Sequence, residues 1–295
     1  MIYPLDLNYQ GLSLAIAAYL IKAPAGNLLV ETGPGSTLPT LLAQLAAHGL
    51  TVADIRHVLV THIHLDHAGA AGWWGQQGAT IYVHHLGAPH LIDPSKLLNS
   101  AGRIYGDQME RLWGQTLPVP AGQIVPLRDQ DVLDICGLQF KAIETAGHAW
   151  HHHALALGDI IFTGDAAGVH LPGQPWTALP APPPEFHLES WLKSLDKLQN
   201  LQATALYLTH FGRVDNPSQH LNHFRETMLS LVAFVRQGLN DGLAVEQLTE
   251  RYIAQNRQLA LQAGISEEIF SHYEAANPMS MSVTGIARYW QKRLT

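Results

Sequence analysis

Four side chains that can bind a metal ion follow one short strand-like run. Val58, Leu59 and Val60 predict a buried strand over 57–61. The next six residues hold one His-x-His pair, an Asp and a further His. These four candidate ligands are His62, His64, Asp66 and His67. Imidazole and carboxylate groups without sulfur suit zinc, iron or manganese. Burying so many polar rings without an ion would cost free energy, so the run predicts a metal site rather than a polar loop.

Neighbouring residues cannot all converge on one ion, so further ligands must come from elsewhere in the chain. Three ligand-type residues each stand just past another strand-like run. They are His148 after 138–143, Asp165 after 160–162, and His210 after 206–209. Because functional sites of layered α/β folds lie at strand ends, we expect these residues to join the first four.

The remaining patterns supply the elements that must position these groups. Up to about residue 215 they mix strands and helices, with a hairpin around the turn at 23–27 and a helix beginning at Leu38. Six prolines make 171–184 a loop. Further strands are predicted over 81–83, 132–135, 138–143, 154–157, 160–162 and 205–209, and a further helix over 187–200.

From Asn216 onward the pattern is helical only. Asn216 is a good N-cap and Pro217 a good first helical residue, and helical spacing returns over 244–257, 266–276 and 283–294. We therefore divide the chain into a mixed α/β domain, 1–215, and a helical C-terminal extension, 216–295.

Composition excludes several classes of protein. The chain has 295 residues, 18 histidines against 17 lysines and arginines, and a net charge of −7, so we expect no nucleic-acid partner. Cys136 is the only cysteine, which excludes an internal disulfide and thiolate clusters. The apolar run 12–21 is too short to span a bilayer and lacks a basic segment before it. We expect a cytoplasmic protein with a small-molecule substrate and no membrane contact, and leave homo-oligomers open.

The ordered motifs resemble the metallo-β-lactamase superfamily of metallohydrolases over about residues 10–215. The motifs are Thr61-His62-Ile63-His64-Leu65-Asp66-His67-Ala68-Gly69, Ala146-Gly147-His148, Thr163-Gly164-Asp165 and Thr209-His210. The resemblance implies an α/β fold, a four-layer αββα sandwich with the metals at one edge. The helical extension is distantly similar to that of glyoxalase II thioesterases, as in stand-alone members with a short helical tail.

Carried over by position, the resemblance implies two divalent metal ions, with zinc favoured over iron or manganese. His62, His64 and His148 would hold the first ion, Asp66, His67 and His210 the second, and Asp165 would bridge both, while His152 supports the site. Two such ions share a water and make hydroxide near neutral pH. Asp66 is then the candidate to accept or relay the proton. Glu31 stands where the family usually has Asp, as a nearby carboxylate that is not a ligand.

We therefore expect a dinuclear hydrolase whose metal-bridging hydroxide attacks a small ester, thioester or related acyl substrate. The stretch 208–212 lacks the Cys-Gly-His-Glu-Tyr pattern of glutathione thioesterases, and Gly168 replaces the Tyr that lactone-cleaving members place there. Two alternatives remain open. One is a mononuclear iron sulfur dioxygenase acting on a persulfide through His62, His148 and Asp165. The other is a non-catalytic, metal-stabilised binding protein.

Twelve histidines have no assigned role. Among them, His170 is the strongest candidate for a functional residue because it stands at the start of the proline-rich loop. His151 and His153, which flank His152, are among the twelve. Five tryptophans are candidates to line a pocket, although single tryptophans more often belong to the core: Trp73, Trp74, Trp113, Trp150 and Trp176.

Overall fold

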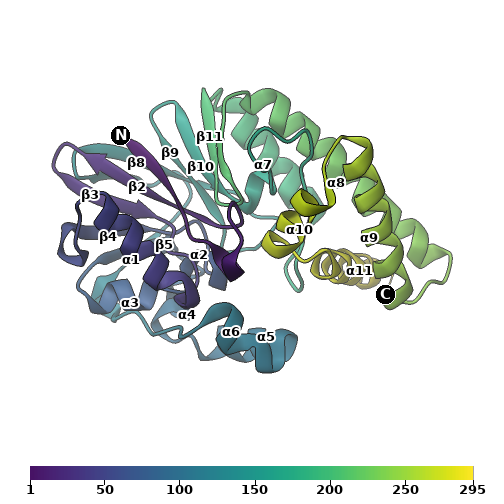
Figure 1. The fold of residues 1–295 in the computed structure, drawn as a ribbon, viewed down its shortest axis with the longest axis horizontal. Helices are drawn as coiled ribbons and strands as arrows, with labels where there is room; N and C mark the ends of the chain where they lie inside the picture. The colour runs from purple at the N-terminus through teal and green to yellow at the C-terminus, as the bar shows by residue number, and fades with distance from the viewer. Residues whose placement is uncertain (295) are drawn as a thin grey trace.

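The computed structural model describes residues 1–294, which form two six-stranded sheets packed face to face with helices on both outer sides (Figure 1). This is the predicted αββα sandwich. The first sheet has the order β1-β2-β3-β4-β5-β6, antiparallel up to β3 and parallel beyond it. The second has the order β12-β11-β10-β9-β8-β7, in which only β10 and β11 run parallel.

The strands of the first sheet are β1 (Ile2–Asp6), β2 (Ala17–Ala23), β3 (Gly26–Val30), β4 (Ile55–Leu59), β5 (Thr80–His84) and β6 (Ile124–Leu127). Those of the second are β7 (Val132–Ile135), β8 (Leu138–Glu144), β9 (His153–Leu157), β10 (Ile160–Gly164), β11 (Ala205–Leu208) and β12 (Gly212–Val214). The sequence patterns did not predict β1, β6 or β12. All three are edge strands, and β1 and β6 each contain a proline, which weakens the strand pattern.

Strand β2 shows why its apolar run alternates only loosely. Tyr19 and Ile21 point between the two sheets, whereas Ala18 and Leu20 point outward to the core beneath the helices. Because both faces of this strand are buried, both sets of positions must be apolar. The run 12–21 therefore consists of a short loop, 12–16, and the first five residues of β2, an inner strand of the sheet.

Six helices follow the strands of the first sheet: α1 (Leu38–Ala47), α2 (Leu65–Ala68), α3 (Ala71–Gln76), α4 (Ala88–Ile92), α5 (Ser95–Tyr105) and α6 (Met109–Trp113). Five belong to the second half: α7 (Leu188–Asn200), α8 (Pro217–Asn240), α9 (Val245–Gln262), α10 (Glu267–Ala276) and α11 (Met279–Leu294). The proline-rich stretch carries no strand or helix, apart from one bridge between Val169 and Ala178.

The four C-terminal helices share a core with the second sheet. Phe224 and Met228 of α8 and Val283 of α11 belong to the same buried cluster as Phe162 of β10. Within residues 1–294, no strand follows residue 215. The buried core, however, includes residues on both sides of this point.

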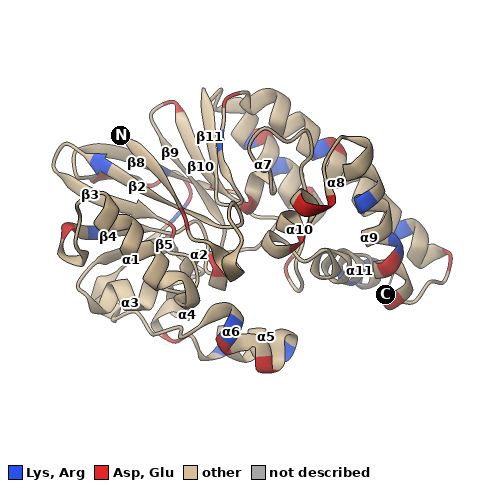
Figure 2. Ribbon diagram, viewed as in Figure 1, with Lys and Arg blue, Asp and Glu red and all other residues tan. Residues whose placement is uncertain are grey.

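Charged side chains are thinly spread. Figure 2 shows Lys and Arg scattered over the outer helices and loops, with no single face that gathers them in this view. Within residues 1–294, no helix combines the length and apolar character needed to cross a bilayer.

Candidate metal centre

Strand ends deliver the predicted ligands to one edge of the sandwich. The chain leaving β4 carries His62 and His64 and continues into α2 with Asp66 and His67. The structure brings all seven predicted ligands together in overlapping groups whose ligand atoms lie within 4.8 Å of one another. These groups are His62, His64 and His148; His62, His67 and Asp165; and Asp66, His67 and His210.

Three imidazole nitrogens form the first group. Nδ1 of His64 lies 3.0 Å from Nε2 of His62 and 2.8 Å from Nε2 of His148. Nδ1 of His148 donates to the Pro180 carbonyl at 2.8 Å, so its Nε2 carries a lone pair that faces the other two rings. Three convergent neutral imidazoles that leave one position open are how catalytic zinc is held.

The second group aims two ring nitrogens at one carboxylate oxygen. Nδ1 of His67 donates to Glu31 Oε1 at 3.0 Å, and Nδ1 of His210 donates to the Ala15 carbonyl at 2.7 Å. The Nε2 atoms of both rings therefore face Oδ1 of Asp165, at 3.1 and 3.4 Å. His67 Nε2 and Asp165 Oδ1 are buried and have no hydrogen-bond partner. A shared cation satisfies such atoms, so this half of the site fits a metal ion.

The two aspartates differ in their exposure. Asp165 directs Oδ1 toward His67 and Oδ2 toward Nε2 of His148 at 3.2 Å, so it links the two groups. Its side chain is 4% exposed, whereas that of Asp66 is 20% exposed. Asp66 Oδ2 lies 3.4 Å from Nε2 of His210. Asp66 is therefore the ligand-type carboxylate that remains accessible from outside.

The pKa values differ between the first and the second group of ligand-type side chains. Burial, with help from neighbouring imidazoles, lowers the pKa of His64 to about 3 and that of His62 well below its usual value. Burial opposes the charged form of His67 as well, but the carboxylates of Asp165, Asp66 and Glu31 outweigh it and raise the pKa of His67, so a positive charge, whether a proton or a metal ion, is favoured at its Nε2. Burial would raise the pKa of Asp66, yet His67 and His210 hold it at about 2. The first half thus offers neutral nitrogens, and the second offers charged oxygens.

Glu31 organises the layer beneath the second group. It is fully buried, and its carboxylate accepts hydrogen bonds from the Thr61 hydroxyl, the Thr61 backbone N–H and the Thr209 hydroxyl, besides that from His67. The carboxylate therefore fixes the orientation of the His67 ring while tying together the ends of β3, β4 and β11.

His152 lies behind the bridging aspartate. Its Nε2 accepts a hydrogen bond from the Asp165 backbone N–H at 3.2 Å, and its Nδ1 lies 2.8 Å from the Thr145 hydroxyl. The ring is fully buried, and burial lowers its pKa well below the usual value. Its position is that of a side chain that supports a ligand rather than that of a ligand.

Replacing His152 with Ala is expected to lower the metal affinity of the protein by about 10- to 100-fold, the usual cost of losing a group that orients a ligand. The change frees the Asp165 backbone N–H, so the bridging carboxylate loses one restraint. A competition titration with a chelator measures the affinity, and His223→Ala, on an exposed part of α8, is the matched control. Equal affinities in the two variants would remove His152 from the supporting layer.

Sequence reasoning missed two side chains beside the first group. His151 Nε2 lies 3.2 Å from Glu185 Oε2, and both form a further ligand-type group with His64. Glu185 follows the proline-rich loop, where no periodic pattern marks it, so only the fold reveals this proximity. His170, in contrast, points Nδ1 at the Trp176 carbonyl at 3.0 Å and joins none of these groups.

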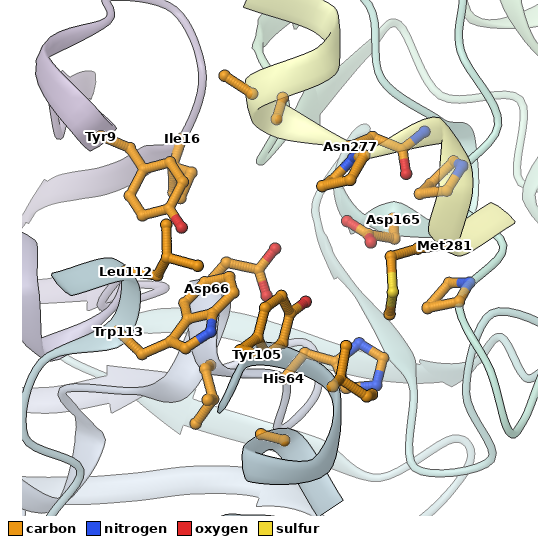
Figure 3. A pocket seen from close by; sticks show the side chains of 18 of the residues that line it. Tyr9, Ile16, His64, Asp66, Tyr105, Leu112, Trp113, Asp165, Asn277 and Met281 are labelled. Carbon is orange, nitrogen blue, oxygen red and sulfur yellow. The ribbon is translucent and has the colours of Figure 1, made fainter. Parts of the chain in front are cut away.

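A cavity of about 340 Å³ opens onto the metal centre. His64, Asp66, His148 and Asp165 form its floor, and Figure 3 shows Asp66 and Asp165 facing the same open space. Of the five tryptophans predicted as candidates, Trp113 lines this cavity. The arrangement can therefore present a substrate to two adjacent groups of metal ligands.

Two six-stranded sheets packed face to face, with clustered His and Asp side chains at one edge, describe a metalloprotein of the layered α/β class. The chain belongs to the metallo-beta-lactamase superfamily, whose sequence profile matches residues 13–210. With the clustered ligands, this membership makes it a metal-dependent hydrolase of that superfamily. The match begins in the loop before β2 and ends on the last predicted ligand, His210.

Individual relatives are distant. A metallo-beta-lactamase fold-containing protein of Sulfurisphaera tokodaii is 26% identical over 58% of this chain and 66% of its own length. An atrochrysone carboxyl ACP thioesterase of Aspergillus fumigatus is 26% identical over 92% of this chain and 75% of its own. The crystal structure of a metallo-beta-lactamase family protein from Thermus thermophilus superposes with a TM-score of 0.69 at 23% identity, covering 99% of this chain and 93% of that one. The last match shows a shared fold that includes the helical extension.

Proposed function

We propose that the protein is a dinuclear metal-dependent hydrolase acting on a small ester, thioester or related acyl compound. The observation that carries the proposal is the convergence of Nε2 of His67 and of His210 on Asp165 Oδ1 beside a complete three-histidine group. Each half offers enough ligands for its own ion, and Asp165 reaches both. Zinc is the favoured metal because three neutral imidazoles with one position left open are how catalytic zinc is held. Imidazole and carboxylate ligands also suit iron and manganese.

The residues of this chain divide the work of such a reaction. When bound, two divalent ions supply an activated water and polarise the acyl carbonyl. The carbonyls of Pro180 and Ala15 and the carboxylate of Glu31 hold the ligand rings in one tautomer. Asp66, the more exposed carboxylate, lies on the cavity floor where it can accept or relay the proton from the attacking water.

The relatives and the net charge support this substrate class. One relative that spans most of this chain is named as an acyl-carrier-protein thioesterase, a hydrolase of an acyl compound. The net charge of −7 weighs against a nucleic-acid substrate and favours a small molecule.

A panel of esters, thioesters, lactones and phosphodiesters tests the proposal on the metal-loaded protein. We expect turnover of esters or thioesters, and a loss of at least about a hundredfold in kcat for Asp66→Ala, in line with the usual contribution of a positioned proton acceptor. Asp215→Ala, at an exposed ion pair with Arg213, is the control.

Two other outcomes would replace the proposal. Iron-dependent oxygen uptake with a persulfide, undiminished in His67→Ala, would identify a mononuclear dioxygenase. Metal-dependent folding without turnover of any compound in the panel would identify a binding protein. Efficient cleavage of phosphodiesters with no ester turnover would also contradict the assigned substrate class.

A further inference from the structure

We infer that the site selects an apolar acyl group, which the C-terminal extension helps to enclose. This inference rests on the proposed hydrolase function and adds the kind of acyl group that it accepts. It follows from the walls of the cavity above the metal centre, which come from four separate parts of the chain: the loop before β2, helices α5 and α6, the proline-rich loop, and the junction of α10 and α11.

The first wall is a packed aromatic group. Tyr9 stacks on Trp113 with ring centroids 5.6 Å apart, and Tyr105 meets the edge of Trp113 at 5.1 Å. Tyr9 is 3% exposed and Trp113 is 8% exposed, so their neighbours hold both rings in place. In Figure 3 these three side chains lie on the same side of the cavity as Asp66. A rigid aromatic wall favours flat or apolar substrate groups at little cost in conformational entropy.

Helix α5 adds an apolar face that the rest of the protein buries only in part. Leu97, Ala101 and Ile104 stand at helical positions i, i+4 and i+7, and all three line the cavity. Ile104 remains 44% exposed. A large apolar side chain left open beside a metal centre gains stability when a substrate's apolar group covers it.

The C-terminal extension supplies the opposite wall. Ala276, Pro278 and Met281, around the junction of α10 and α11, line the cavity, and Figure 3 shows Met281 facing it. The Asn277 amide and the Ser282 hydroxyl anchor this junction by donating to the Leu179 carbonyl at 3.0 and 2.7 Å. The extension is thus fixed to the proline-rich loop and completes the site.

Charged groups are few on these walls. Apart from the metal-ligand carboxylates, the charged lining residues are Arg111 and Glu274. The Arg111 guanidinium already donates to the side chains of Gln108 and Gln10, at 2.8 and 3.1 Å. Outside the metal ligands only these two lining side chains carry charge, so the remaining wall favours an apolar group.

A graded series of p-nitrophenyl esters tests the inference on the metal-loaded protein. From acetate to butanoate to hexanoate, we expect kcat/KM to rise about fourfold per added methylene, the ratio for burying that group.

Paired variants locate the effect. Ile104→Asp should lower kcat/KM for the hexanoate ester at least about tenfold more than it lowers kcat/KM for the acetate ester. Ile92→Asp is the matched control, because Ile92 is 40% exposed on α4 and does not line the cavity. A series with no dependence on chain length, or one that Ile104→Asp leaves unchanged, would overturn the inference while the hydrolase proposal stands.

A binding measurement separates the two proposals. Phenyl alkyl ketones match the esters in shape and cannot be hydrolysed, so their dissociation constants follow the cavity alone. Calorimetry should show affinity rising with alkyl length and falling in Ile104→Asp. If no ester or thioester is turned over but the ketones follow this order, the hydrolase proposal fails and the cavity's preference remains. If the ketones show no order, the preference itself is wrong.

Discussion

Replacing Asp165 with Asn is expected to lower kcat/KM about a thousandfold and to leave fewer than two metal ions per chain. Asp165 is the one carboxylate that faces both ligand groups, through Oδ1 toward His67 and Oδ2 toward His148. The amide keeps the shape of the side chain but removes its charge and offers one oxygen instead of two. Metal ions contribute several kcal/mol to such reactions, and each 1.36 kcal/mol is a tenfold change in rate.

Metal analysis and ester kinetics on the same preparations check this result. Asp215→Asn removes an exposed carboxylate that pairs with Arg213, and should retain both ions and full activity. An Asp165→Asn protein with two ions and undiminished turnover would show that the two ligand groups do not depend on a shared carboxylate.

Replacing Glu31 with Ala is expected to weaken metal binding by about 10- to 100-fold and to lower the free energy of unfolding by about 3 kcal/mol. The change leaves the Thr61 and Thr209 hydroxyls and Nδ1 of His67 without their common acceptor in a fully buried place. Chelator competition measures the first effect, and denaturant unfolding of the metal-free protein measures the second.

The variant Glu31→Asp separates the effect of the carboxylate charge from the effect of side-chain length. It restores the residue usual in the family, one methylene shorter, so we expect a smaller loss than in Glu31→Ala. Glu250→Ala, on an exposed part of α9, is the control for removing a glutamate. If Glu31→Ala bound metal and unfolded like that control, the supporting role of Glu31 would be wrong.

The sequence predicted that these seven side chains would meet because strand ends are local features. His148, Asp165 and His210 each follow a buried apolar run, and neighbouring strands of a sheet bring such ends together. Glu185 could not be predicted in this way. It lies in an irregular segment, and its proximity to His151 and His64 depends on how that segment folds back over the site.

The cavity walls likewise could not be predicted from the sequence. The spacing of Leu97, Ala101 and Ile104 marks an amphipathic helix, but a helical pattern does not say what its apolar face will meet. Only the fold places Met281 across the cavity from them. The C-terminal helices were predicted from periodicity, and their contribution to the site emerged only from the structure.

Stepwise zinc addition to metal-stripped protein, with bound metal and ester hydrolysis recorded at each step, tests the dinuclear centre most directly. The ligand arrangement predicts binding that saturates at two ions per chain, with full activity only after the second. Saturation at a single ion, with activity already complete, would contradict it.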